Sequence, residues 1–145
     1  MPGASDAAGP AFVDTNIWVY AHLEVRGDPR HGIALALVEG AGDQVISPQV
    51  VAEYYSVMLR NSRTDAWIAA NLRAMFARTR LQPANAAVVE SALALRARYG
   101  FSIWDCQIIA TALQAGCTTL FTEDLQHGQV LEARLRVVNP FAPVG

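Results

Sequence analysis

Short apolar runs alternate along the chain with longer segments in which apolar residues recur at helical spacing. A short apolar run bounded by polar or turn-forming residues is typical of a buried β-strand. The sequence predicts strands in "AFVDT" (11–15), "DQVIS" (43–47), "CTTLFT" (117–122) and "LRVVNP" (135–140), with "RLQP" (80–83) as a shorter candidate. The last of the four longer runs ends at a proline, which is expected to stop the strand.

Helix-type segments separate these runs, and several carry a recognisable start or stop signal. Ser47, Thr64 and Ser102 are favoured N-cap residues, and Pro48 suits the first helical position. Gly100 is expected to end the helix that precedes it. The expected helices span 16–23, 30–41, 48–61, 64–79, 84–100 and 103–116.

Two of these helices have apolar faces that the spacing defines. For segment 30–41 the expected apolar positions are Ile33, Leu35, Leu37 and Val38. For segment 48–61 they are Val50, Val51, Tyr54, Met58 and Leu59.

Strands and helices alternate from end to end, which favours the α/β class with a central, mostly parallel sheet flanked by helices. The chain has no repeat, low-complexity tract or linker, so we expect one domain over residues 10–145. Residues 1–9 contain neither a basic side chain nor an apolar signal-peptide core and are expected to form a flexible lead-in. No apolar run reaches the roughly 20 residues that span a bilayer, so we expect no membrane association.

The charge composition narrows the possible functions. The net charge is −2, which provides no overall basic surface for passive nucleic-acid binding. All eleven basic residues are arginine. The absence of lysine excludes P-loop enzymes, whose motif requires Gly-Lys. It also argues against receiver-like and haloacid-dehalogenase-like phosphotransfer domains, and the second aspartate of the phosphatase pattern is replaced here by Asn16.

Cys106 and Cys117 are the only cysteines. If both lie on one helix, eleven residues separate them by roughly 16 Å along its axis, too far for a disulfide. No CxxC or zinc-type spacing is present. We therefore expect two buried thiols in a reducing compartment, and a cytoplasmic protein.

Four acidic residues occupy comparable positions along the predicted elements. Asp14 ends the first strand, Asp124 follows the strand at 117–122, and Glu53 and Asp105 lie early in two helices. The carboxyl ends of parallel strands meet at one edge of a sheet, where ligands bind. Carboxylates gathered there repel one another unless a cation compensates them. Without lysine, either an arginine or a hard divalent cation such as Mg²⁺ or Mn²⁺ fills this role.

Four segments resemble, in order, the successive motifs of PIN domains, most closely those of the VapC-like toxin branch of bacterial toxin–antitoxin systems. They are "FVDTNIWVY", "SPQVVAEYYSVM", "SIWDCQIIATALQAG" and "TLFTEDLQHGQ". The resemblance covers nearly the whole chain. It implies a Mg²⁺- or Mn²⁺-dependent endoribonuclease, held inactive by a cognate antitoxin protein and forming a homodimer.

The same resemblance implies roles for individual residues. Asp14, Glu53, Asp105 and Asp124 match the four family acids, with Asp14 and Asp105 as the usual direct metal ligands. Thr122 matches the threonine or serine that precedes the last acid. Thr15 and Asn16 are expected to orient Asp14, although Asn16 is also a plausible cap. Glu123, adjacent to Asp124, leaves open which of the two acids faces the site.

Each of the four acids also has a purely structural interpretation. Asp14 is a good N-cap for the helix that follows it. Asp105 lies three residues after Ser102, the spacing of a capping box, and the helix dipole favours an acid there. In the structural interpretation, Glu53 lies on a solvated helix face and Asp124 begins a turn.

Other side chains are weaker candidates. His127 titrates near neutrality but is expected to be an exposed loop residue. Trp18, Trp67 and Trp104 can stack on bases, but their helical spacing favours core or dimer-face positions. Five arginines in the middle third either form a solvated face or contact RNA phosphates: Arg60, Arg63, Arg73, Arg78 and Arg80. The alternative to an enzyme is a non-catalytic PIN-like module that binds RNA or protein.

Overall fold

The computed structural model describes residues 9–40 and 42–143, in which a six-stranded sheet has the order β3-β2-β1-β4-β6-β5. Residues 1–8 of the predicted lead-in (1–9) lie outside the described residues, and Gly9 donates its backbone N–H to Thr118 Oγ1 at 3.0 Å. The strands are β1 (Ala11–Val13), β2 (Gln44–Ile46), β3 (Arg80–Leu81), β4 (Thr119–Phe121), β5 (Val130–Leu131) and β6 (Leu135–Val138). The helices are α2 (Thr15–His22), α3 (Arg30–Gly40), α4 (Pro48–Arg60), α5 (Asp65–Arg78), α6 (Ala86–Tyr99) and α7 (Ile103–Gln114).

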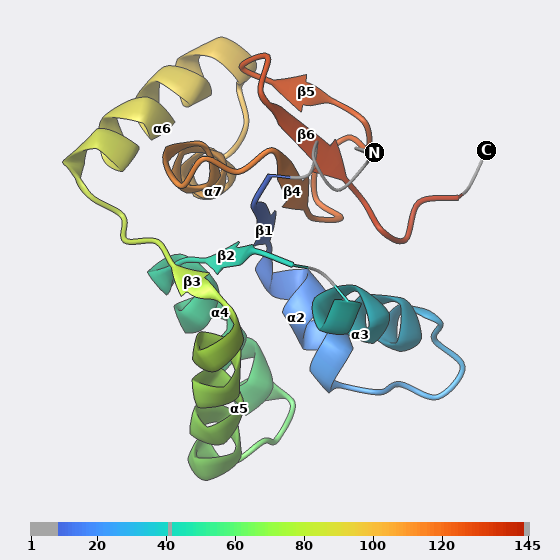
Figure 1. Cartoon of the computed structure of the whole chain (residues 1–145). Helices are drawn as coiled ribbons and strands as arrows, with labels where there is room; N and C mark the ends of the chain where they lie inside the picture. The colour runs from blue at the N-terminus through green and yellow to red at the C-terminus, as the bar shows by residue number, and fades with distance from the viewer. Residues whose placement is uncertain (1–8, 41, 144–145) are drawn as a thin grey trace.

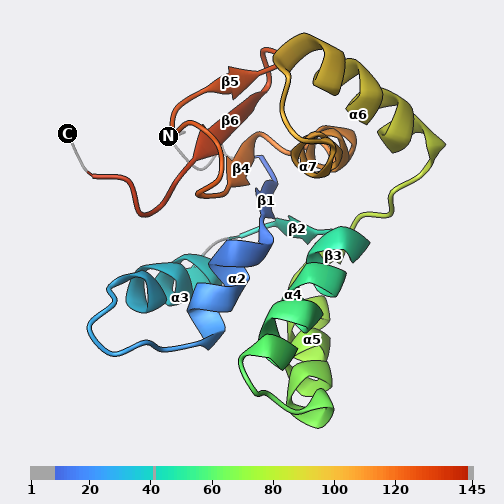
Figure 2. The ribbon, with the colours of Figure 1, turned by 180° about the vertical axis from the view of Figure 1, so that it is seen from behind.

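The sheet is parallel except at one edge, as the sequence predicts. β1 pairs in parallel with β2 and β4, β3 with β2, and β6 with β4, whereas β5 is antiparallel to β6. The chain winds outward from β1 to β3 and then returns to the other side of β1 at β4. Right-handed crossovers therefore put α6 and α7 on the opposite face from α2, α3, α4 and α5 (Figures 1 and 2). The α/β prediction is confirmed.

The core lies around the three central strands. Phe12, Val45 and Leu120, one from each of β1, β2 and β4, are completely buried. Trp18 is also in the core, where its indole nitrogen donates to the Val13 carbonyl at 3.2 Å. Because β1 and β4 are covered on both faces, their carboxyl ends are held rigidly beside each other. The backbone bond from Asp14 N to Phe121 O, at 3.0 Å, fixes that register.

The predicted helix signals are confirmed in detail. Ser47 accepts from Val50 N, Thr64 from Trp67 N and Ser102 from Asp105 N. Gly100 adopts a left-handed conformation at the end of α6, with φ of 76°. Both cysteines are buried free thiols, with Cys106 in α7 and Cys117 just beyond it.

The predicted apolar faces are wrong at two positions. In α3 the buried residues are Ala34 and Val38, and Ile33 is 41% exposed. Leu59 of α4 is also exposed. The buried side of α3 carries Ala34 and Val38, and Ile33 lies outside it. The sequence shows which side chains are apolar but not which side of α3 meets α2.

The hairpin strand β5 is absent from the sequence prediction. Glu132 and Ala133 form its turn with φ of 51° and 57°. Two successive positive φ values define a type I′ turn, which normally carries Asn or Gly. Because Glu-Ala gives no such signal, the strand before it could not be recognised.

Among the described residues, no helix is both long and apolar enough to cross a membrane.

Candidate active site

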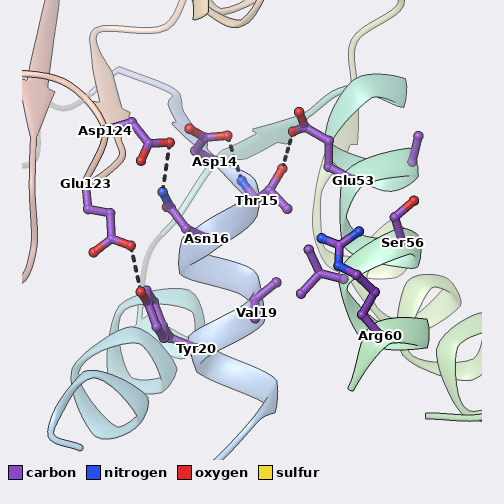
Figure 3. Close-up of a pocket in the computed structure, with 12 residues that line it drawn as sticks. Asp14, Thr15, Asn16, Val19, Tyr20, Glu53, Ser56, Arg60, Glu123 and Asp124 are labelled. Carbon is purple, nitrogen blue, oxygen red and sulfur yellow. Dashed lines mark hydrogen bonds between the residues drawn. The ribbon is translucent and has the colours of Figure 1, made fainter. Parts of the chain in front are cut away.

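A cleft of about 580 Å³ opens at the carboxyl ends of β1 and β4, between α2 and α4 (Figure 3). Asp14 and Asp124 reach it from the two strand ends, and Glu53 reaches it from α4. This is the point at which the strand order reverses, the usual ligand position of an open α/β sheet. Three of the four predicted acids therefore line a common cavity.

Asp14 occupies the base of this cleft, and only 6% of the residue is exposed. Its Oδ1 accepts from Thr15 N at 2.7 Å, so it does cap α2. Its Oδ2 accepts from Thr122 Oγ1 at 2.9 Å. Burial raises the pKa of Asp14 to about 7, and the nearby Asp124 and Glu53 carboxylates add to the rise. The pKa stays raised even though both oxygens are hydrogen-bonded.

The three polar residues expected to support the acids each donate a hydrogen bond to one of them. Besides bonding Asp14, Thr122 accepts from Asp124 N at 3.1 Å and so links two acids. Thr15 Oγ1 donates to Glu53 Oε1 at 2.7 Å. Asn16 Nδ2 donates to Asp124 Oδ2 at 3.1 Å. Asn16 therefore orients Asp124 and not Asp14.

Glu53 is tied to α7 through a residue that sequence reasoning missed. Gln49 lies one turn before Glu53 on α4, and its Nε2 is 3.4 Å from Glu53 Oε2. The same nitrogen donates to the Trp104 carbonyl at 3.3 Å. A glutamine four residues before an acid on a helix is the only sequence signal for this contact.

Asp105 lies in the first turn of α7 but does not line the cleft. Partial burial raises its pKa, the Ser102 hydroxyl opposes that rise, and the Glu53 charge adds to it. For Asp124, partial burial also raises the pKa, followed by the charge of Asp105. The fourth acid therefore lies close enough to interact electrostatically with the others, at the side of the cleft nearest α7.

Glu123 is turned away from Asp14 by a separate network. Tyr20 OH donates to Glu123 Oε1 at 2.7 Å (Figure 3). Arg30 Nη1 lies 3.8 Å from Glu123 Oε2. Arg30 also donates to Tyr20 OH at 2.7 Å and pairs with Asp28 at 2.7 Å. Asp124, which bonds Asn16, is therefore the acid nearer the base of the cleft.

Several predicted candidates lie elsewhere. His127 is exposed and accepts from Asn139 N at 3.0 Å, and it does not line the cleft. Trp104 is 65% exposed, whereas Trp67 is partly buried. Of the five grouped arginines, Arg60 alone lines the cleft, where Ser56 and Tyr20 join it as residues the sequence did not single out.

The donors of this site suit a hard divalent cation. Within the described residues, none of the four acids forms an ion pair with an arginine or histidine. Asn16 Oδ1 is buried without a hydrogen-bond partner, which adds an unused oxygen beside the carboxylates. The same residues contain no group of three carboxylate, histidine or cysteine side chains already close enough to hold one ion. The donor chemistry fits Mg²⁺ or Mn²⁺, but the side chains surround the cleft without converging on one point.

Comparison with protein-family profiles matches residues 11–131 to the PIN domain. Among solved structures, VapC20 of Mycobacterium tuberculosis, described as a sarcin–ricin loop cleaving toxin, is 25% identical with a TM-score of 0.67, over 86% of this chain and 98% of that one. A toxin–antitoxin complex from Klebsiella pneumoniae is 22% identical with a TM-score of 0.65, over 90% and 98%. VapBC2 from Rickettsia felis, bound to a promoter DNA fragment, is 19% identical with a TM-score of 0.63, over 90% and 100%. No curated protein sequence matches the chain.

Proposed function

The chain belongs to the PIN domain family, and on that premise we propose that it is a divalent-metal-dependent endoribonuclease that hydrolyses RNA phosphodiester bonds. The observation that carries the proposal is the cleft itself. The carboxylates of Asp14, Glu53 and Asp124 come from the end of β1, from α4 and from the loop after β4 and line it, and none of the three has an ion-pair partner among the described residues. Such an arrangement is costly unless a cation compensates the charges.

We assign the direct metal contacts to Asp14 and Asp105, with Asp124 and Glu53 completing the site directly or through water. When bound, Mg²⁺ or Mn²⁺ would lower the pKa of a water molecule and stabilise negative charge on the phosphoryl oxygens. The residues of the chain have the task of gathering and orienting oxygen donors. The uncompensated acids, the raised pKa of Asp14 and the unpartnered Asn16 oxygen support this assignment.

Each supporting residue then has a defined task. Thr122 holds Asp14 and Asp124 at a fixed separation, because its hydroxyl bonds both. Thr15 restrains Glu53, and Asn16 restrains Asp124. The substrate water is the nucleophile in this scheme, so no covalent intermediate with the protein forms.

We further propose that the protein is the toxin of a toxin–antitoxin pair, binds a cognate antitoxin and forms a homodimer in the cytoplasm. The similarity to VapC20 and to the Klebsiella and Rickettsia complexes supports this role. The two buried free thiols are compatible with a reducing compartment.

The test is RNA cleavage by purified protein in Mg²⁺. We expect Asp14→Asn and Asp105→Asn each to lower the rate by at least about 100-fold, since several kcal/mol of charge stabilisation is lost. Asp43→Asn is the matched control, because Asp43 is exposed and pairs with Arg80 at the far side of β2. Expression of the parent, but not of Asp14→Asn, should slow bacterial growth. Equal cleavage rates in the parent and both site variants would refute the mechanism.

A non-catalytic binding module is the second candidate. One observation favours it: within the described residues no three ligand-type side chains are preassembled around one point. RNA binding by the parent protein without cleavage in Mg²⁺ or Mn²⁺ would select this alternative.

A further inference from the structure

The cleft continues beyond the acidic residues along α4. Glu53, Ser56 and Arg60 follow one another at helical spacing and all line it. Seven residues separate Glu53 from Arg60, about 10 Å along the helix axis. In Figure 3 the Arg60 guanidinium extends into the space between α4 and α2. The cleft therefore has an acidic end and a basic end.

Arg60 differs from Arg30, the other arginine close to the cleft, because no acidic side chain pairs with its charge among the described residues. Arg30, near the opposite wall, pairs with Asp28 and also donates to Tyr20. Arg60 has no acidic partner within 4 Å among the described residues.

The helix dipole gives Arg60 a possible structural role, because it is the last residue of α4. Two other helices carry an arginine in the last turn that donates to a backbone carbonyl. Arg78, the last residue of α5, donates to the Val38 carbonyl of α3 at 3.0 Å, and Arg96 in the last turn of α6 donates to Gly100 O at 2.7 Å. In the described structure Arg60 makes no such carbonyl contact. If Arg60 served only to stabilise the C-terminal end of α4, the N–H donors of its guanidinium would have no partner in the described structure.

Between its two ends the cleft is bordered by uncharged side chains of α2 and α4. Val19 of α2 and Val57 of α4 line it there, and the Ser56 hydroxyl adds a hydrogen-bond donor near Arg60. An RNA strand presents negative phosphates separated by less polar sugars and bases. When a metal ion at the acidic end holds one phosphate, the adjoining sugar lies against Val19 and Val57. The neighbouring phosphate then lies within reach of the Arg60 guanidinium.

We propose that Arg60 binds a phosphate that flanks the scissile one, so that a single-stranded RNA segment lies along the groove between α2 and α4. The guanidinium forms charge-assisted hydrogen bonds to the phosphate oxygens. Arg60 is thus a positioning residue that fixes the strand without reading its sequence. This inference rests on the proposed nuclease function.

The test measures binding of a short single-stranded RNA to the protein with its acidic residues intact, in Ca²⁺ instead of Mg²⁺ to suppress cleavage, over a range of salt concentrations. Arg60→Ala should weaken binding about tenfold. It should also lower the slope of log affinity against log salt by about 0.7, the value for one phosphate contact on a single strand. Arg60→Lys should retain the slope. Arg73→Ala, an exposed arginine on α5 outside the cleft, is the matched control and should leave both quantities unchanged.

In the active protein, Arg60→Ala should raise KM with little change in kcat, because the contact forms before and during the reaction. Identical salt slopes for Arg60→Ala and Arg73→Ala would overturn the inference while leaving the nuclease function intact. RNA binding that depends on Arg60, in a parent protein that cleaves nothing, would overturn the nuclease function alone. If the parent protein neither binds nor cleaves RNA, both fail.

Discussion

At the scale of single residues, Asp14 combines two roles that the sequence presents as alternatives. Its carboxylate caps α2 through Thr15 N and also lies at the base of the acidic cleft. Oδ1 of Asp14 accepts the capping hydrogen bond from Thr15 N, and Oδ2 accepts from the Thr122 hydroxyl. The apolar residues Phe12 and Val13 before it predict a buried strand end, and with it the strongly buried carboxylate.

The raised pKa of Asp14 predicts how stability depends on pH without metal. The pKa is 3.8 for an ordinary aspartate and about 7 in the folded protein. The folded state therefore binds this proton more tightly than the unfolded state does. The stabilisation from this protonation is fully present below about pH 4 and is lost as the pH rises through 7. In EDTA, the free energy of unfolding in urea should fall over this range.

Asp14→Asn should flatten that decline and exceed the parent in stability at pH 8 by on the order of 2 kcal/mol. Added Mg²⁺ should stabilise the parent more at pH 8 than at pH 5, since it competes with the proton. A parent protein in EDTA whose stability rises between pH 4 and pH 7 would contradict the burial argument.

Thr122 is the second residue whose removal has a specific consequence. It is 1% exposed, and its hydroxyl bonds both Asp14 and the backbone of Asp124. Thr122→Val keeps the shape but removes both bonds, and we expect a 10- to 100-fold loss of cleavage rate or metal affinity, roughly the cost of losing a supporting contact. Thr119→Val, on β4 just before Thr122, is the control. Equal rates in the two variants would assign Thr122 a packing role only.

At the scale of elements, the sequence predicts helix starts better than helix faces. Ser47, Thr64 and Ser102 cap α4, α5 and α7 because capping depends on residues adjacent in the chain. The buried side of α3 depends instead on its contact with α2, and Ile33 is exposed for that reason. The link from Gln49 to Trp104 joins α4 to α7 and likewise requires the three-dimensional fold.

The cap of α4 can be tested apart from chemistry. Ser47 is buried, and its Oγ accepts from Val50 N at 3.3 Å. Ser47→Ala should lower the free energy of unfolding by about 1 kcal/mol, and Ser47→Gly by less than Ser47→Ala does. Urea denaturation measures both changes. A destabilisation that is larger for glycine than for alanine would show that packing, rather than the cap, dominates at this position.

At the scale of the whole molecule, the site follows from the order of the strands. β1 and β4 are adjacent although more than a hundred residues separate Asp14 from Thr122. Alternating strands and helices predict a parallel sheet, and a parallel sheet predicts a site at the carboxyl ends. Which strands are neighbours is a property of long-range packing, so Asp14 and Asp124 are predictable as site residues, whereas Tyr20 and Arg60 as cleft residues are not.

The central claim is that the acidic cleft hydrolyses RNA with a divalent cation. The most direct measurement is the single-turnover rate of RNA cleavage as Mg²⁺ is titrated into the EDTA-treated protein. We expect a rate that rises from zero and saturates for the parent and for Asp43→Asn, and that stays near zero for Asp14→Asn at every concentration. A rate that is independent of Mg²⁺, or one that Asp14→Asn shares, would contradict the account.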